Sequence, residues 1–381
     1  MQYRTLGPSG PKVSALGFGA MRLPIIDGRS DAIDEELARA MIRRAIDAGV
    51  NYVDTAFPYH GTSRSEHGQS EPFVGRTLAD GYRERVLLAT KMPSWLIESR
   101  EDMERHLDGQ LERLATDHID CYLLHGLNAG QWSTLDSLGV LAFLDAALAD
   151  GRIRYAGFSF HDEAAAFAPI ADAYDWTFCQ LQYNYLDVDE QAGTAGVRHA
   201  EARGMGVVVM EPLKGGRLAG RLPDDVQAVL DEADRPRTAA EWALDFVWDD
   251  PAVSLLLSGM STMEQVEQNL RSAERAQVGG LCQSEHALIA RARAAFRART
   301  KADCTACRYC MPCPSGVDIP GCFAKLNAAS MWDDAEGIRA AYRKLEGTAS
   351  LCTECGLCEA SCPQQLPIRS LLATAADLFG E

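Results

Sequence analysis

The regular alternation of short apolar segments with longer amphipathic segments over residues 1–300 most constrains how this chain can fold. The apolar segments have the length of buried strands, and the amphipathic segments have the period of helices. Eight strand–helix units in roughly 280 residues are what a (β/α)8 barrel requires. The sequence therefore predicts an α/β chain whose main domain, residues 1–300, is a (β/α)8 TIM barrel.

The expected strands start with a hairpin, residues 3–6 and 13–16, whose second arm continues to Ala20. The next apolar runs end at Asp54, Lys91 and His125. The remaining strands are expected at 155–160, 178–183, 206–210 and 253–257, and helices at 34–48, 100–115, 135–150, 190–203 and 238–248.

No Gly-x-Gly-x-x-Gly turn follows the first strand, which disfavours an open dinucleotide-binding sheet.

Eight of the 12 cysteines fall into two tight groups near the C-terminus. The groups read Cys304-x-x-Cys307-x-x-Cys310-x-x-Cys313-Pro314 and Cys352-x-x-Cys355-x-x-Cys358-x-x-x-Cys362-Pro363. Three thiolates at three-residue intervals and a fourth before proline are typical of 4Fe–4S ligands. Two zinc sites with four thiolates each are the alternative. We expect two 4Fe–4S clusters, since the third cysteine and the Cys-Pro endings are repeated.

In two-cluster ferredoxins the fourth cysteine of each motif ligates the other cluster. One cluster should then be bound by Cys304, Cys307, Cys310 and Cys362, and the other by Cys313, Cys352, Cys355 and Cys358. Helices expected at 319–329 and 333–345 separate the motifs, so residues 301–381 are predicted to form a small α-helical ferredoxin-like domain.

We expect Cys121, Cys179 and Cys282 in apolar cores, and Cys322 has no assignment.

The net charge of −17 excludes a typical nucleic-acid partner, because phosphate binding needs a basic surface. No apolar run approaches the ~18 residues of a membrane span, and the N-terminus lacks the apolar core of a signal peptide. We therefore expect a cytoplasmic protein with no membrane partner. In that reducing compartment, spaced cysteines are expected to bind metal rather than form disulfides.

Three chemically informative side chains stand at expected strand ends: Asp54, Lys91 and His125. Tyr59 follows on the loop after the first of them. Active-site residues of such barrels lie at this end of the strands. A lysine beside a tyrosine stabilises the phenolate and lowers the tyrosine pKa. Each residue alone could be structural, but together they predict a proton donor for a carbonyl oxygen, with Tyr59 donating, Lys91 tuning it, Asp54 pairing with Lys91 and His125 orienting the carbonyl.

Several motifs in this order resemble the aldo-keto reductase family over residues 3–272. They are Asn51-Tyr52-Val53-Asp54-Thr55-Ala56-x-x-Tyr59, Ala89-Thr90-Lys91, Asp120-x-Tyr122-Leu123-Leu124-His125, Gly157-x-Ser159, Gln180-x-Gln182-Tyr183-Asn184, Glu211-Pro212-Leu213-x-Gly215-Gly216 and Ser258-Gly259-x-Ser261-x-x-x-Gln265-x-x-x-Asn269. The whole chain resembles the subgroup of that family with a C-terminal ferredoxin-type domain.

The resemblance implies that the barrel binds NADP(H) or NAD(H) and transfers a hydride between the cofactor and a small carbonyl or alcohol. It also implies that Asp54, Tyr59, Lys91 and His125 are the catalytic residues. The residues that match the family's cofactor contacts are Gly19, Ala20, Met21, Asp54, Ser159, Gln180, Leu213, Lys214, Gly215, Gly216, Ser261, Gln265 and Asn269.

The chain departs from the family pattern at three cofactor positions. Phe160 stands where the family often has Asn, and Met210 replaces the aromatic residue that commonly stacks on the nicotinamide. Gln265 replaces an arginine that many members direct at the 2′-phosphate, which leaves Lys214, Ser261 and Thr262 as candidate phosphate ligands. The sequence therefore does not choose between NADPH and NADH.

Three functions are consistent with these features. The first, which we favour, is a nicotinamide-dependent carbonyl reductase or alcohol dehydrogenase whose clusters are structural or serve contacts in a homo-oligomer. The second is an electron-transfer oxidoreductase whose clusters pass single electrons to or from the barrel site or a redox partner protein. The third is a nucleotide-binding redox sensor without catalysis, which would not need the four-residue set.

Overall fold

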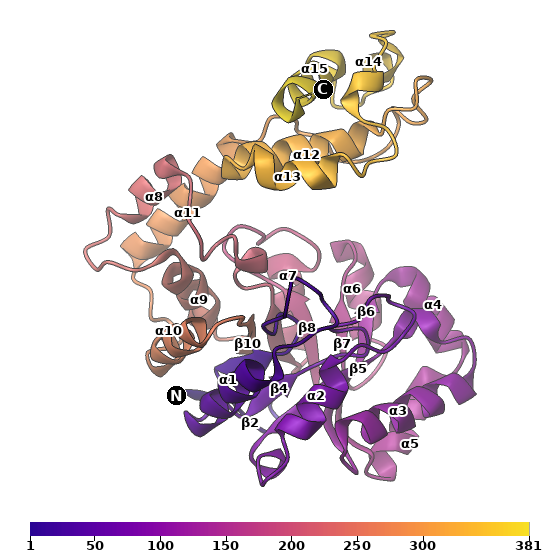
Figure 1. The fold of residues 1–381 in the computed structure, drawn as a ribbon, viewed down its shortest axis with the longest axis vertical. Helices are drawn as coiled ribbons and strands as arrows, with labels where there is room; N and C mark the ends of the chain where they lie inside the picture. Colours follow the sequence, from indigo (N-terminus) through magenta and orange to yellow (C-terminus); the bar gives the residue numbers. More distant parts are fainter. Residues whose placement is uncertain (381) are drawn as a thin grey trace. The chain divides into compact units, whose positions relative to one another are not determined.

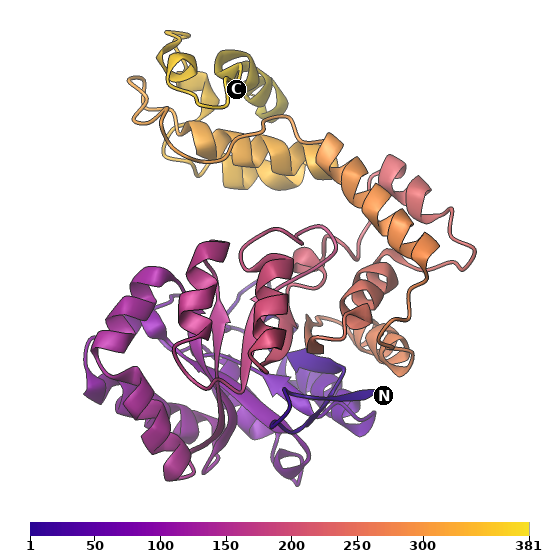
Figure 2. The same ribbon diagram turned by 180° about the vertical axis from the view of Figure 1, so that it is seen from behind.

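The structure, a computed structural model, describes residues 1–380. The chain divides into two compact units, which Figures 1 and 2 show from opposite sides. The first unit consists of Met1–Gly220 and Arg237–Cys282. The second consists of Arg221–Pro236 and the residues from Gln283 onwards.

The first unit is built around a closed barrel of eight parallel strands, which confirms the predicted (β/α)8 fold. Neighbours around the barrel follow the order of the sequence, and the last strand pairs with both the first and the seventh. The strands are β3 (Leu16–Gly19), β4 (Tyr52–Asp54), β5 (Leu87–Met92), β6 (Ile119–Leu127), β7 (Ile153–Phe160), β8 (Phe178–Gln182), β9 (Gly206–Met210) and β10 (Val253–Gly259).

The N-terminal hairpin closes one end of the barrel. It consists of β1 (Tyr3–Thr5) and β2 (Lys12–Ser14), which pair antiparallel and stay separate from β3. Leu6 and Val13 at this hairpin pack in one buried cluster with side chains of the barrel interior, among them Tyr52, Leu123 and Phe178. Because this end is filled with apolar side chains, a polar site must lie at the opposite, C-terminal end of the strands.

The helices of the first unit surround the barrel (Figure 1). A buried apolar layer between them and the strands includes Met41, Phe73, Phe143 and Trp248. The helices are α1 (Glu35–Asp47), α2 (Ser70–Thr77), α3 (Arg100–Leu114), α4 (Ala129–Ser137), α5 (Val140–Ala149), α6 (Phe167–Ala171), α7 (Gly193–Ala202), α9 (Ala239–Asp249) and α10 (Met263–Glu274).

The single helix expected at 135–150 is in fact two helices, α4 and α5. Asn128 caps α4, because its side chain accepts a hydrogen bond from the main-chain N–H of Gln131. Helix α4 therefore begins at Ala129, before the expected start at residue 135. Gly139 has a positive φ of 76°, a left-handed conformation that glycine adopts at little cost, and it separates the two helices. Within residues 1–380 no single helix is long and apolar enough to cross a membrane. The bent pair α4–α5 reaches the length and apolar composition of a membrane span only when both helices are taken together.

The second unit is helical, as predicted for the cysteine-bearing region. It contains α8 (Asp224–Leu230), α11 (Gln283–Ala298), α12 (Ile319–Trp332), α13 (Ala335–Tyr342), α14 (Leu357–Ala360) and α15 (Ile368–Phe379). Helices α12 and α13 confirm the two helices expected between the motifs. The core of α12, α13 and α15 includes Phe323 and Leu326, and the rings of Tyr342 and Phe379 stack with centroids 4.1 Å apart.

The compact second unit starts earlier in the chain than the expected second domain, because α11 packs against α8. The division into a catalytic part at 1–300 and a cluster part at 301–381 stays a prediction. Of the cysteines outside the two motifs, Cys121, Cys179 and Cys322 are buried. Cys282 is exposed, so its expected core position was wrong. It is the last residue of the first unit and directly precedes α11.

Candidate active site

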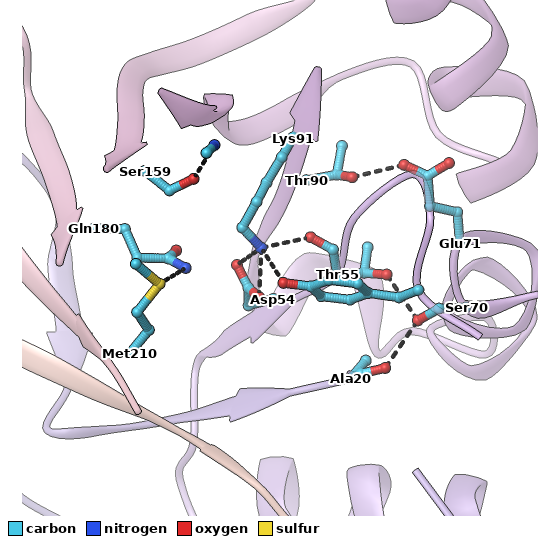
Figure 3. Close-up of polar contacts among 12 residues, drawn as sticks. Ala20, Asp54, Thr55, Ser70, Glu71, Thr90, Lys91, Ser159, Gln180 and Met210 are labelled. Carbon is cyan, nitrogen blue, oxygen red and sulfur yellow. Dashed lines mark hydrogen bonds and ion pairs between the residues drawn. The ribbon is translucent and has the colours of Figure 1, made fainter. Parts of the chain in front are cut away.

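The four residues predicted to be catalytic lie together at the C-terminal end of the barrel (Figure 3 labels two of them). Asp54 is the last residue of β4, and it aligns with Gly19 of β3 and Ala89 of β5. Lys91 lies near the end of β5. Parallel strands bring their carboxyl ends to one rim, which is why residues far apart in the sequence meet here.

Lys91 is the centre of the polar contacts (Figure 3). Its side chain is fully buried, and its Nζ lies 2.7 Å from each carboxylate oxygen of Asp54. The same ammonium donates to the main-chain oxygen of Thr55 at 2.9 Å and to the hydroxyl of Tyr59 at 3.3 Å. Burial alone would lower the pKa of Lys91, but the carboxylate of Asp54 raises it above its usual value, so the group stays charged. The lysine thus presents a fixed positive charge to the Tyr59 hydroxyl.

The tyrosine pKa differs from the expectation. Burial raises the pKa of Tyr59 above its usual value, and the positive charge of Lys91 only partly opposes that rise. Lys91 acts in the expected direction, but the net lowering expected from the sequence was wrong, because the sequence does not reveal how far the Tyr59 hydroxyl is removed from water. Tyr59 is therefore protonated at neutral pH, which is the form that can donate a proton to a carbonyl oxygen.

His125 faces Tyr59 across the site. Their rings meet edge to face with centroids 6.1 Å apart, and the ring of Trp95 lies 5.1 Å from that of His125. Burial, and then the charge of Lys91, hold the pKa of His125 well below its usual range, so the imidazole is neutral. Its Nδ1 is buried without a hydrogen-bond partner among residues 1–380. A neutral imidazole can donate one hydrogen bond to a carbonyl oxygen.

A buried network behind the site fixes the Tyr59 loop and the end of β5. Ser70, the first residue of α2, donates to the main-chain oxygen of Ala20 and shares a 2.8 Å hydrogen bond with Thr55 (Figure 3). The next residue, Glu71, is fully buried and accepts from Thr90 at 2.6 Å. Glu71 also accepts from two residues of α3, Gln110 at 2.6 Å and Arg113 at 2.7 Å. Sequence reasoning missed this network, since its members are scattered over three elements.

An open cavity of about 570 Å³ extends from the catalytic residues across the barrel mouth. Most of the predicted cofactor residues line it, together with Tyr59 and His125. The predicted residues in its wall are Gly19, Met21, Asp54, Gln180, Leu213, Gly215, Gly216, Ser261, Gln265 and Asn269. Three predicted residues, Ala20, Ser159 and Lys214, do not line the cavity; Ala20 and Ser159 are buried.

At the inner end of the cavity, Gln180 presents an unpaired buried oxygen. Its Nε2 contacts the sulfur of Met210 at 3.6 Å, while its Oε1 has no partner among the described residues (Figure 3). The hydroxyl of Ser159 accepts a 2.7 Å hydrogen bond from the main-chain N–H of Gly126. A buried amide oxygen without a partner is costly, so this position suits a ligand that brings an N–H donor, such as a nicotinamide carboxamide.

The loop after β9 turns tightly, with several residues in the left-handed conformation. Glu211, Lys214, Gly215 and Gly216 all have positive φ, at 54°, 45°, 66° and 92°. The Nζ of Lys214 lies 2.6 Å from both carboxylate oxygens of Asp187. Lys214 is therefore paired with Asp187 and does not line the cavity, and its expected role beside a phosphate stays a prediction. This pair could not be predicted, because its partners are 27 positions apart in the sequence.

The third group of predicted residues lies at the other end of the cavity. The Oε1 of Gln265 accepts from the main-chain N–H of Ser261 at 2.7 Å, and the Ser261 hydroxyl donates to the main-chain oxygen of Arg22. Asn269 donates to the Ser258 hydroxyl at 3.0 Å. These bonds orient polar side chains along the start of α10, where a polar end of a cofactor could bind.

Two charged residues of the cavity were missed from the sequence. Arg22 and Glu211 line the cavity from different loops, and their side chains form an ion pair at 3.5 Å. Arg22 directly follows Met21, so its position beside an expected cofactor contact was the available signal. Gln268 also lines the cavity, one helical turn after Glu264 of α10.

The eight motif cysteines line two hollows of the second unit. One hollow is lined by Cys304, Cys307, Cys310 and Cys362. The other is lined by Cys313, Cys352, Cys355 and Cys358, with Cys310 at its edge. Among residues 1–380, no three His, Cys, Asp or Glu side chains come close enough to hold a single metal ion. The grouping matches the crossed ligand sets expected from the sequence.

Both motifs wrap their hollow with the same backbone shape. The second and fourth residues after the first cysteine are left-handed in each motif: Ala306 and Arg308 in one, Glu354 and Gly356 in the other. In each motif the N–H of the second residue donates to the first cysteine's sulfur at 3.4 Å. Amide donors around cysteine sulfurs are features of iron–sulfur sites, so the backbone fits the predicted clusters.

Comparison with known families supports the fold and both units. Residues 15–279 match the family described as the Aldo/keto reductase family, and residues 303–367 match the 4Fe-4S dicluster domain. The chain therefore belongs to the aldo-keto reductase family and carries a C-terminal 4Fe-4S domain. This confirms the family resemblance and an oxidoreductase enzyme.

Curated relatives match part of this chain, and three examples follow. Uncharacterized oxidoreductase YrpG of Bacillus subtilis is 28% identical, over 72% of this chain and 91% of the relative. L-galactose dehydrogenase of Arabidopsis thaliana is 26% identical, over 74% and 91%. The 6-dehydroglucose reductase of Novosphingobium aromaticivorans is 30% identical, over 61% and 75%. Among solved structures, aldo-keto reductase AKR11C1 from Bacillus halodurans in its holo form has a TM-score of 0.62 and 28% identity, covering 77% of this chain and 96% of that one.

Proposed function

We propose that the barrel interconverts a small carbonyl compound and its alcohol with NADPH or NADH, and that Tyr59 is the general acid and base. The observation that carries the proposal is the contact of the buried Lys91 ammonium with both Asp54 and the Tyr59 hydroxyl at the inner end of the cavity. A protonated phenol beside a fixed positive charge would stabilise the negative charge that a carbonyl oxygen gains during reduction.

The roles of the side chains follow from their contacts. In carbonyl reduction Tyr59 donates its proton to the carbonyl oxygen, and Lys91 stabilises the phenolate that remains. Asp54 keeps Lys91 charged, and neutral His125 hydrogen-bonds the carbonyl oxygen and orients it. When bound, the nicotinamide supplies the hydride, so that a hydride and a proton together convert the carbonyl to an alcohol. In the reverse direction the Tyr59 phenolate accepts the alcohol proton.

The cavity residues support binding of the cofactor in extended form. Gln180 would receive the nicotinamide carboxamide, since its Oε1 is buried and lacks a partner among the described residues. Gly215 and Gly216 leave the backbone of the loop after β9 accessible to the diphosphate. Ser261, Gln265 and Asn269 would contact the adenosine end. We propose no preference between the two cofactors, and we propose a reducing compartment such as the cytoplasm.

We further propose that the second unit binds two 4Fe–4S clusters. The support is the division of the motif cysteines between two hollows and the repeated backbone wrap of the two motifs. The clusters would supply one-electron chemistry or rigidity to the unit. Zinc stays the alternative, and iron and sulfide analysis of anaerobically purified protein separates the two.

The test of the main proposal is isotope transfer. Protein is incubated anaerobically with NADPH or NADH that carries deuterium at both C4 positions of the dihydronicotinamide and with a panel of aldehydes, including aldoses because two relatives are named for sugars. The proposal expects one deuterium on the carbonyl carbon of the product, with one cofactor oxidised per alcohol formed. Cofactor oxidation without deuterium in the product, or no reduction of any carbonyl, would overturn it.

Electron transfer through the clusters is the second candidate function, favoured by the presence of the cysteine unit itself. A hydride carries two electrons and a 4Fe–4S cluster accepts one, so this function needs a mediator or a partner protein. Bleaching of the cluster absorption on addition of NADPH would support it. Complete carbonyl reduction with unchanged cluster absorption would favour the first function.

A further inference from the structure

An arginine lies on the loop that carries Tyr59 and is held by a tryptophan. Arg64 is exposed, and its guanidinium carbon lies 4.4 Å from the ring centroid of Trp95. The indole Nε1 of Trp95 donates a 2.9 Å hydrogen bond to the main-chain oxygen of Arg64. Stacking and the hydrogen bond together fix the position of a side chain that would otherwise move freely in solvent.

Trp95 connects Arg64 to the catalytic residues. The Trp95 ring lies 5.1 Å from the ring of His125, which lies 6.1 Å from the ring of Tyr59. Arg64 is close enough for its charge to contribute to the low pKa values of both His125 and His161, although burial is the larger cause in each case. Arg64 is therefore linked to the catalytic His125 through one side chain, Trp95, and neither Arg64 nor Trp95 is among the residues that line the cavity.

Arg64 differs from Lys91 and Arg22 because it has no acidic partner among the described residues. Lys91 is paired with Asp54, and Arg22 is paired with Glu211. Within residues 1–380, no carboxylate forms an ion pair with Arg64, and both neighbouring histidines, His125 and His161, have lowered pKa values. A positioned arginine with no acidic partner is suited to bind an anion from solution, because its planar fork can donate two hydrogen bonds at once.

We propose that Arg64 forms a subsite for an anionic group of the substrate, so that the preferred substrates are small carbonyl compounds bearing a carboxylate or a phosphate a few bonds from the carbonyl. This inference rests on the proposed carbonyl reduction and names its substrate class. The subsite is separate from the cofactor's adenosine end, since Ser261, Gln265 and Asn269 follow β10 whereas Arg64 follows β4.

The test compares matched neutral and anionic aldehydes. The carboxylate arm uses 4-methylbenzaldehyde and 4-carboxybenzaldehyde, and the phosphate arm uses glyceraldehyde and glyceraldehyde 3-phosphate. The wild-type KM should be lower for the anionic member of at least one pair, and the arm that shows it identifies the anion. In Arg64→Gln the ratio of neutral to anionic KM should fall by about 10-fold to 100-fold, as expected for loss of a hydrogen bond to a charged group.

Three comparisons separate a subsite from a general effect. The kcat values for the two members should change equally, because Arg64 binds a part of the substrate that does not react. Arg64→Lys should recover part of the ratio, since it keeps the charge without the fork. Arg105→Gln, which removes an exposed arginine of α3 paired only with Asp102, should leave the ratio unchanged. An unchanged ratio in Arg64→Gln, or no anion preference in the wild type, would overturn the inference.

Equilibrium binding tests the anion subsite even if the protein reduces none of these aldehydes. Calorimetric titration of 4-carboxybenzyl alcohol and 4-methylbenzyl alcohol in the presence of NADPH measures the same preference without reaction. Tighter binding of the carboxylate by wild type than by Arg64→Gln supports the subsite, and equal binding by the two proteins rejects it. Absence of carbonyl reduction together with such a difference would reject the proposed function alone.

Discussion

Both carboxylate oxygens of Asp54 lie 2.7 Å from the ammonium of Lys91, and neither side chain is more than 3% exposed. Removing one member of a buried ion pair leaves an uncompensated charge, which costs about 3–5 kcal/mol of stability. We expect Asp54→Asn and Lys91→Met each to lose that much free energy of unfolding, measured by urea denaturation of the barrel. The double variant should lose less than the two single losses added together. Full additivity would show that the two groups do not interact.

The pH dependence of carbonyl reduction should follow Tyr59. Since burial raises the pKa of Tyr59, the hydroxyl stays protonated below its raised pKa, and it loses its proton only as the pH rises past that value. The kcat/KM for reduction should therefore be flat from about pH 6 to 9 and fall above about pH 10, the ordinary tyrosine value. Alcohol oxidation, which needs the phenolate, should increase over the same range. A reduction profile that falls near pH 7 would contradict this assignment.

Glu71 should matter more than a surface glutamate with a similar partner. It is fully buried and accepts from Thr90, Gln110 and Arg113, so Glu71→Gln removes a charge that three donors share. We expect a loss of about 2 kcal/mol or more in the free energy of unfolding, and a lower kcat because the end of β5 is no longer fixed. Glu35→Gln, whose partners Arg39 and Arg76 are about half exposed, should cost less than about 1 kcal/mol. Similar losses for the two variants would refute the structural role of Glu71.

Iron content tests the two hollows of the second unit. Cys362 lines only one of them, so Cys362→Ser should lose roughly half of the bound iron, as expected for one of two 4Fe–4S clusters. Cys322 lies in the core of the unit, where its sulfur contacts the main-chain oxygen of Gly347, and Cys322→Ala should keep the full iron content. Loss of all iron in Cys362→Ser, or none, would contradict the assignment of cysteines to two separate clusters.

The barrel and the four central residues could be predicted because local pattern determines them. Strand length, helical period and the polar residue at each strand end are visible along the chain, and parallel strands bring those ends together. The spacing of Cys304 to Cys313 and of Cys352 to Cys362 is equally local. The break between α4 and α5 was missed, although Gly139 was its signal.

What could not be predicted depends on contacts between distant residues. The pairing of Lys214 with Asp187 could not be foreseen, and the burial of Tyr59 reversed the expected direction of its pKa shift. Arg64 resembles any exposed loop arginine in the sequence. Its relation to Trp95 and His125 exists only because the loops after β4 and β5 meet the C-terminal end of β6 at one rim.

The most direct test of the account compares wild type with Tyr59→Phe in anaerobic carbonyl reduction by NADPH and by NADH. The variant keeps the ring and its contact with His125 but lacks the hydroxyl that contacts Lys91 and donates the proton. The account predicts unchanged cofactor binding and a kcat lower by about 10²-fold to 10⁴-fold, the usual contribution of a general acid. Turnover of Tyr59→Phe at the wild-type rate would show that the chemistry does not take place at this tyrosine.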